Sequence, residues 1–181
     1  MECQLFQIDD PTNDGERDVL NVLKRLPTGY TIYRELKLDS SRRQKEAGIQ
    51  KRQPDFVVVA DDVGVVAIEV KDWNLRRNEY RWLDQHNVER VDSNGNVTEI
   101  TNPIHQADTY KYALIDQVDD VFVSSLVAFP RITRNHFHNR VANRDLFNNP
   151  NTRFYLDPNR TIFKDQMDRY LTEPEGLLRE M

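Results

Sequence analysis

Two short apolar runs separated by four residues restrict the fold of this chain more than any other feature. Residues 56–60 and 65–68 are almost entirely aliphatic or aromatic, and Asp61-Asp62-Val63-Gly64 between them has the residue types of a tight turn. Near-continuous apolar runs are typical of central strands that are covered on both faces. The sequence therefore predicts a β-hairpin at the centre of a sheet.

Polar residues lie at the open end of this hairpin. Asp55 precedes the first run, and Glu69 and Lys71 close the second. With the turn centred near Asp62, Asp55 lies opposite Glu69, and opposed residues of a hairpin point to the same face of the sheet. Lys71 shares that face because side chains alternate along a strand. The three side chains are therefore expected to lie within reach of one another.

Two adjacent carboxylates repel unless a cation lies between them, and Mg²⁺ prefers oxygen ligands of this kind. A bound divalent cation acidifies a water molecule and offsets charge on a phosphate, while Lys71 orients that water or stabilises the developing charge. The alternative is structural. Glu-x-Lys at a strand end is commonly a solvated ion pair, and Pro54-Asp55 before a strand is ordinary.

Length and composition indicate a single domain. The chain has 181 residues, of which 38% are hydrophobic and 30% charged, which is enough to bury a core. No apolar stretch reaches the roughly 20 residues of a membrane span, and no signal-peptide pattern follows Met1. The single cysteine, Cys3, excludes an internal disulfide and a cysteine zinc site. These features predict a cytoplasmic protein.

Hydrophobic periodicity and turn residues predict further elements around the hairpin. Helices are expected at 13–26, at 102–118 after the capping pair Asn102-Pro103, and near 165–171. Strands are expected at 30–38, 80–83, 88–91, 97–100 and 121–129, with loops at 40–53 and after Pro130.

Basic residues gather just before Asp55 although the net charge of the chain is −5. A solvated loop is the simplest interpretation of such a run. Beside a metal site it becomes a contact for a nucleic-acid backbone. The residues predicted for that contact are Arg42, Arg43, Lys45, Lys51 and Arg52.

Two helical features support a site at the hairpin. Glu16 joins the apolar stripe of the first helix, although Asn13-x-x-Glu16 is also the spacing of a helix cap. Gln106 and Tyr110 lie four residues apart on one helix face. The Gln106 amide can hold a carboxylate, a water or a phosphate oxygen. The alternative is an exposed Gln106 and a Tyr110 that packs in the core.

Taken in order, Glu16, Pro54-Asp55, Glu69-Val70-Lys71 and Gln106-x-x-x-Tyr110 resemble the PD-(D/E)xK nuclease superfamily and its RecB-like branch. Asn102-Pro-x-x-Gln106 and the Val-Lys-Asp-Trp-Asn segment at 70–74 are most similar to the nuclease-related domain called NERD. The resemblance covers about 15–129. It implies an α/β core of the restriction-endonuclease type, with a mixed central sheet, a β-hairpin and flanking helices.

The resemblance also implies phosphodiester hydrolysis that depends on Mg²⁺ or Mn²⁺. Asp55, Glu69 and the Val70 carbonyl would hold the metal, and Lys71 would be the catalytic lysine. Glu16, Gln106 and Tyr110 would complete the catalytic set, with DNA favoured over RNA as substrate and DNA repair as one setting. A fused or separate helicase is the implied partner, and no membrane is expected. We expect one domain over 1–181, with its core at 13–130 and a peripheral extension at 131–181 that leads into a longer protein.

Other readings of the sequence remain open. The same fold could bind nucleic acid with little cleavage of its own, or the carboxylates could form a structural ion-pair cluster. His136-Phe137-His138 resembles a metal pair but has no matched third ligand, which favours a surface loop. Trp73 and Trp82 are expected to pack against a sheet. No phosphate-binding Gly-Lys-Ser/Thr motif occurs, which argues against an ATPase.

Overall fold

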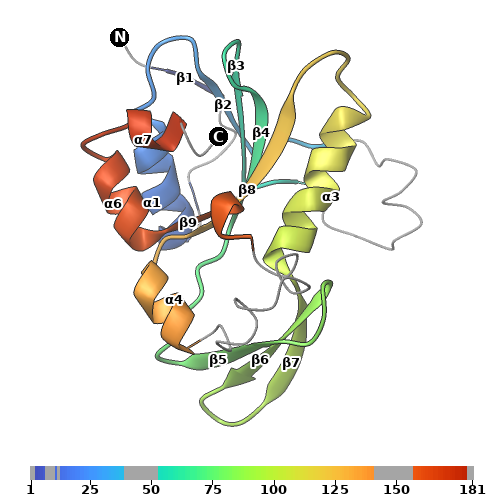
Figure 1. The fold of residues 1–181 in the computed structure, drawn as a ribbon, viewed down its shortest axis with the longest axis vertical. Coiled ribbons are helices and arrows are strands. Elements are labelled where there is room, and N and C mark those ends of the chain that lie inside the picture. The colour runs from blue at the N-terminus through green and yellow to red at the C-terminus, as the bar shows by residue number, and fades with distance from the viewer. Residues whose placement is uncertain (1–2, 7–10, 12, 39–52, 141–156, 179–181) are drawn as a thin grey trace.

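The computed structural model describes residues 3–6, 11, 13–38, 53–140 and 157–178. Within these ranges the chain forms a mixed α/β fold with a central sheet and a separate antiparallel sheet (Figure 1). The central sheet has the strand order β1-β2-β3-β4-β8-β9. Its strands are β1 (Gln4–Phe6), β2 (Thr31–Arg34), β3 (Phe56–Ala60), β4 (Gly64–Val70), β8 (Val123–Phe129) and β9 (Thr161–Phe163).

The predicted hairpin lies at the centre of this sheet. β3 pairs antiparallel with β4, and Ala60 lies opposite Gly64 as the sequence predicts. β4 then pairs in parallel with β8, which arrives after a long crossover connection. β3 and β4 are therefore covered by a strand on each outer side and are buried almost throughout, which explains their aliphatic composition.

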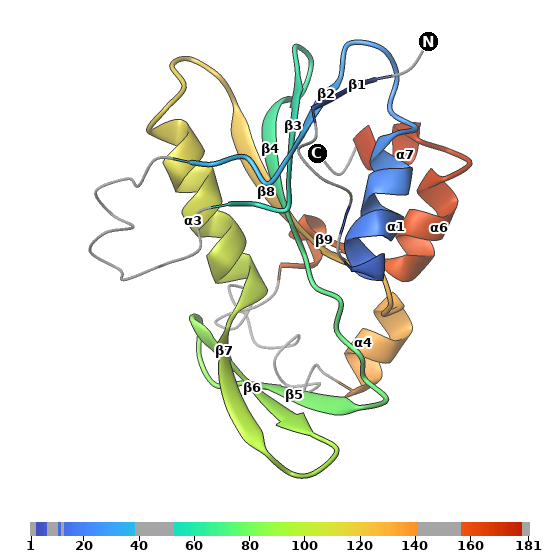
Figure 2. The same ribbon diagram turned by 180° about the vertical axis from the view of Figure 1, so that it is seen from behind.

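Helices cover the two faces of the central sheet (Figures 1 and 2). One face carries α3 (Pro103–Ile115), which packs on the odd-numbered positions of the hairpin such as Val57 and Ala67. The other face carries α1 (Asp14–Leu23), α6 (Lys164–Tyr170) and α7 (Glu175–Leu178), which pack on even-numbered positions such as Val58 and Val66. The two faces of β4 therefore look into different cores.

The second sheet lies beyond the carboxyl end of β4 and the start of α3 (Figure 1). Its strands are β5 (Asn78–Trp82), β6 (Asn87–Asp92) and β7 (Val97–Thr101). Trp73 joins this sheet to the central one, because its ring stacks on Tyr80 at 3.9 Å between centroids and contacts Phe129 at 5.1 Å. The prediction that Trp73 packs against a sheet is therefore confirmed.

Most predicted elements are present with shifted ends. The helix after Asn13 ends at Leu23 and continues as tight turns to Leu26, directly before Pro27. The strand predicted at 30–38 ends at Arg34, because Glu35 has a positive φ of 48°. The helix predicted near 165–171 is confirmed as α6. The predicted loop at 40–53 lies outside the described residues except for its last position.

One prediction after Pro130 was wrong. The segment expected to be a surface loop forms α4 (Arg134–Arg140). Phe137 is only 1% exposed and packs among the aromatic rings beneath the second sheet. A single buried aromatic residue among polar neighbours gives no helical periodicity, so the amphipathic pattern that would predict this helix is missing.

Candidate functional site at the open end of the hairpin

The hairpin register brings two acidic side chains to the end of β4 on the α3 face. Phe56 lies opposite Ile68, and one further step in the same register sets Asp55 opposite Glu69. Both side chains are buried, with residue exposures of 5% for Asp55 and 1% for Glu69. Carboxylates are seldom buried to this extent without specific partners, so their surroundings decide what they can do.

Hydrogen bonds connect these carboxylates to the strand end and to α3. The Val70 backbone N–H donates to Asp55 Oδ2 at 2.6 Å. Lys71 Nζ donates to Glu69 Oε1 at 2.7 Å and to Gln106 Oε1 at 2.8 Å. Gln106 Nε2 in turn donates to the Tyr110 hydroxyl at 2.8 Å. Four predicted residues, from Glu69 to Tyr110, therefore form one continuous chain of hydrogen bonds.

The start of α3 explains why Gln106 meets Lys71. The Asn102 side chain caps the helix by accepting from the Ile104 N–H, and Pro103 occupies the first turn. Asn102 also donates from its amide to the Gln85 carbonyl at 2.9 Å, which ties the helix start to the second sheet. One turn separates Gln106 from the fully buried Tyr110, so both project toward the sheet.

Electrostatics at the site favour a protonated Tyr110. Burial raises the pKa of the Tyr110 hydroxyl well above its usual range, and the charges of Glu69 and Asp55 raise that pKa further. The hydrogen bond from Gln106 acts in the opposite direction but does not offset burial. Tyr110 is therefore a hydrogen-bond donor at neutral pH.

Glu16 lies elsewhere. It belongs to α1, on the opposite face of the central sheet, where Arg34 NH2 contacts its Oε2 at 3.1 Å. Its backbone N–H donates to the Asn13 side chain at 2.8 Å, and the Asn13 amide donates to Glu16 Oε1. The capping interpretation of Asn13-x-x-Glu16 is therefore observed. The catalytic role assigned to Glu16 stays a prediction, and the hydrogen-bond chain described above does not include it.

The donor set at the hairpin suits a hard divalent cation. Asp55 and Glu69 offer carboxylate oxygens on one face, and within the described residues the Lys71 ammonium contacts Glu69. Magnesium is commonly held by one or two carboxylates together with water, which fits this pair. Among the described residues no three His, Cys, Asp or Glu side chains are grouped to hold a metal ion. Backbone carbonyls such as that of Val70, together with water, would have to complete the coordination.

One connection was not anticipated from the sequence. Arg131 Nε contacts Asp72 Oδ1 at 2.5 Å, and its NH2 contacts Asp14 Oδ2 at 3.1 Å. Asp72 directly follows Lys71, so Arg131 links the end of β4 to the start of α1. These residues lie far apart in the sequence, and no local spacing signals that they meet.

The remaining predicted residues divide into two groups. The basic residues Arg42, Arg43, Lys45, Lys51 and Arg52 lie outside the described residues. His136 and His138 lie on α4, and His105 packs its ring against His86 at 4.3 Å between centroids.

Comparison with known families agrees with the resemblance in the motifs. The family model of NERD, the nuclease-related domain, matches residues 11–130, which is more than half of the chain. The chain belongs to the NERD family. The matched region contains all six residues predicted as catalytic, from Glu16 to Tyr110. Neither a curated protein nor a solved structure matches this NERD domain. No helix in the described part of the chain is long and apolar enough to cross a membrane.

Proposed function

We propose that this NERD domain is a metal-dependent nuclease of the PD-(D/E)xK type that hydrolyses phosphodiester bonds in DNA. The observation that carries the proposal is the hydrogen-bond chain from Glu69 through Lys71 and Gln106 to Tyr110. A structural ion pair would need only Glu69 and Lys71. This chain also includes two residues of the helix α3. Membership of a nuclease-related family supports nucleic acid as the substrate class.

Asp55 and Glu69 would hold the metal, assisted by the Val70 carbonyl. When bound, Mg²⁺ or Mn²⁺ supplies an acidified water and charge stabilisation at the phosphate. The protein contributes a fixed pair of carboxylates. The Val70 N–H bond orients Asp55, and the Lys71 bond orients Glu69. Side chains held in this way lose little freedom when a substrate arrives, which favours catalysis.

Lys71 would act on the phosphate. Its side chain is 20% exposed, and its ammonium lies between a buried carboxylate and the Gln106 amide. From there it can donate to a phosphate oxygen on which negative charge develops. The Gln106 oxygen holds the ammonium in place, and the Tyr110 hydroxyl accepts from the Gln106 amide nitrogen on the other side. The basic residues at 42–52 would contact the DNA backbone, and a fused or separate helicase would supply single strands.

A second candidate function follows from the burial of the site. Glu69 is 1% exposed, and the Lys71 ammonium already has two protein partners. A phosphate must compete with these partners before it reaches the ammonium. A domain that binds DNA and cleaves it only weakly is the alternative that this observation favours.

The two functions are separated by a cleavage assay on single-stranded, linear and circular DNA with Mg²⁺, with Mn²⁺ and with a chelator. We expect metal-dependent cleavage by the native protein and a loss of at least about 10²-fold in Lys71→Ala, which is typical when one charge-stabilising donor is removed. Lys111→Ala, which removes a half-buried lysine of α3, is the matched control and should cleave normally. Binding without cleavage by every variant would instead support the weak-cleavage alternative.

A further inference from the structure

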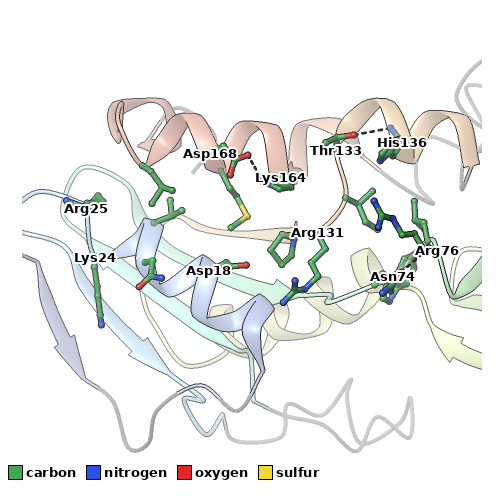
Figure 3. A pocket seen from close by; sticks show the side chains of 18 of the residues that line it. Asp18, Lys24, Arg25, Asn74, Arg76, Arg131, Thr133, His136, Lys164 and Asp168 are labelled. Atoms are coloured by element: carbon green, nitrogen blue, oxygen red, sulfur yellow. Dashed lines mark hydrogen bonds and ion pairs between the residues drawn. The ribbon is translucent and has the colours of Figure 1, made fainter.

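A groove of about 1360 Å³ lies on the face of the sheet opposite the candidate site. Its walls are α1 on one side and α6 with the start of α4 on the other, and it is called the α1–α6 groove below (Figure 3). One end is formed by 73–76 and the other by the end of α1. Because Trp73 follows Lys71 by two residues, the groove begins where β4 and the candidate site end.

The charge of the groove differs in sign from that of the whole chain. Within the described residues, five of its lining residues are Lys or Arg and two are Asp, an excess of three positive charges. The chain as a whole carries a net charge of −5. Cationic side chains concentrated in one groove of an acidic protein favour a polyanionic ligand.

Two arginines at the ends of the groove are available to such a ligand. Lys164 contacts Asp168 at 2.5 Å, and Arg131 contacts Asp72 and Asp14, so both are already neutralised. Arg25 and Arg76 are exposed at opposite ends of the groove (Figure 3). Across the part of the chain that the structure describes, no acidic side chain lies within ion-pair distance of either.

The floor of the groove is apolar. Val22, Trp73, Ile132 and Met167 line it, and all four are buried. Phosphates need cations, whereas base faces need apolar or aromatic surface. A single strand presents both, while a duplex hides its base faces by stacking. An acidic peptide would use the arginines but has no bases to place on the floor.

We propose that the α1–α6 groove binds single-stranded nucleic acid, with Arg25 and Arg76 contacting the backbone and the bases lying over the apolar floor. The link to catalysis rests on the proposed function, since the strand would pass from the groove over the end of β4 toward Lys71. The binding itself does not depend on cleavage. On this proposal, the domain holds its nucleic-acid substrate in single-stranded form.

Fluorescence anisotropy tests the binding with a labelled single-stranded deoxyoligonucleotide of about 16 nucleotides in a chelator, so that no cleavage occurs. We expect Arg25→Ala/Arg76→Ala to weaken binding about tenfold at about 50 mM salt. The slope of log affinity against log salt should fall by about 1.4, or about 0.7 for each phosphate contact, so the difference from the native protein shrinks toward about 200 mM. The control Arg17→Ala/Arg81→Ala removes two exposed arginines outside the groove and should bind within about twofold of the native protein. Thermal melts monitored by circular dichroism establish that both variants are folded.

Four outcomes would overturn the proposal: no binding by the native protein, equal loss in the control, equal affinity for the duplex, or equal competition by an oligoglutamate of the same charge. Cleavage in Mg²⁺ is measured separately. Binding that depends on Arg25 and Arg76, without any cleavage, would refute the proposed nuclease activity but support binding in the α1–α6 groove. Cleavage together with binding that does not depend on either arginine would refute binding in the groove but support the proposed nuclease activity.

Discussion

At the scale of single residues, the Gln106 amide is the point where the strand and the helix of the candidate site meet. Its oxygen accepts from Lys71 and its nitrogen donates to Tyr110. If the Gln106 amide were rotated by 180°, its nitrogen would face the Lys71 ammonium, and two donors would meet. Its oxygen would face the Tyr110 hydroxyl, which could still donate to it. Because an ammonium can only donate, the bond from Lys71 fixes the amide with its oxygen toward Lys71, and the Tyr110 hydroxyl then accepts from the amide nitrogen.

Tyr110→Phe tests this arrangement. The ring still fills the core, but the half-buried Gln106 amide loses its acceptor, so we expect a loss of about 1 kcal/mol in the free energy of unfolding. Urea denaturation measures the loss. Tyr112→Phe, at a position on the same helix that is 45% exposed, is the control and should change stability by a few tenths of that amount. Equal effects of the two substitutions would argue against the Gln106–Tyr110 bond.

His105, next to Gln106, gives a prediction on pH. Burial lowers the pKa of His105 in the folded protein, and the neighbouring His86 lowers that pKa further. The unfolded chain therefore binds a proton more readily, so stability is full above the unfolded pKa of about 6.5 and is lost as the pH falls through the folded value. We expect His105→Asn to reduce the loss of stability between about pH 7.5 and pH 5.5, measured by urea denaturation.

The exposed His136 provides the comparison for this experiment. A reduction of the same size in His136→Asn would show that the burial of His105 is not the cause. A His105→Asn variant with an unchanged pH dependence would show that other groups cause the acid destabilisation.

Single-residue positions were predictable from the sequence where strand and helix periodicity determine them. Asp55, Glu69 and Lys71 share a face because the hairpin register requires it, and Gln106 and Tyr110 share a face because they are one turn apart. The contact of Arg131 with Asp72 and Asp14 was not predictable. It depends on how the turn after β8 packs against α1, and no periodicity connects those segments.

At the scale of elements, the turn of the hairpin depends on Gly64. Its φ is +86°, and a Cβ there would overlap the Phe122 carbonyl oxygen at the start of β8. The same carbonyl accepts from the Val65 N–H at 2.9 Å. The missing side chain therefore allows the turn of one hairpin to contact the backbone that leads into the next strand.

Gly64→Ala is expected to lower the free energy of unfolding by about 3 kcal/mol or more, because overlap with backbone adds to the strain of a positive φ. Gly95→Ala is a matched control. Gly95 has a φ of +82°, but its Cβ would meet no atom within 4 Å. Gly95→Ala should therefore lower the free energy of unfolding by about 1 kcal/mol, from backbone strain alone. Equal losses in chemical denaturation would show that Phe122 can move away at little cost.

Elements with a strong local pattern were predicted better than those held by distant contacts. β3 and β4 are runs of aliphatic residues around a turn, and α3 has a capping residue followed by proline. The helix α4 lacks both signals and is stabilised instead by Phe137 among the rings of Phe129 and Phe163. Tertiary packing of that kind overrides weak local preferences.

At the scale of the whole molecule, a cation that binds only the folded protein must stabilise it. With a dissociation constant of about 1 mM, about 10 mM free Mg²⁺ would add about 1.4 kcal/mol to the free energy of unfolding. We expect the melting temperature to rise with Mg²⁺ and to return to its starting value with a chelator. Differential scanning calorimetry measures both changes without any substrate.

The carboxylates should account for this response. Asp55→Asn and Glu69→Gln are expected to abolish the Mg²⁺-dependent rise, whatever their melting temperatures without metal. Asp165→Asn, at an exposed acid in the first turn of α6, should retain it. A rise of the same size in all three variants would place metal binding away from the hairpin.

The order of strands across the central sheet has a consequence for synthesis on the ribosome. β3 and β4 pair with each other as soon as both have emerged, but the Lys71 N–H donates to the Ala128 carbonyl at 2.8 Å, and its ammonium needs Gln106. Both partners are translated much later. A nascent chain therefore carries Asp55 and Glu69 for some time before it possesses the groups that orient Lys71, and the site is completed only when the strand ending at Phe129 has been made.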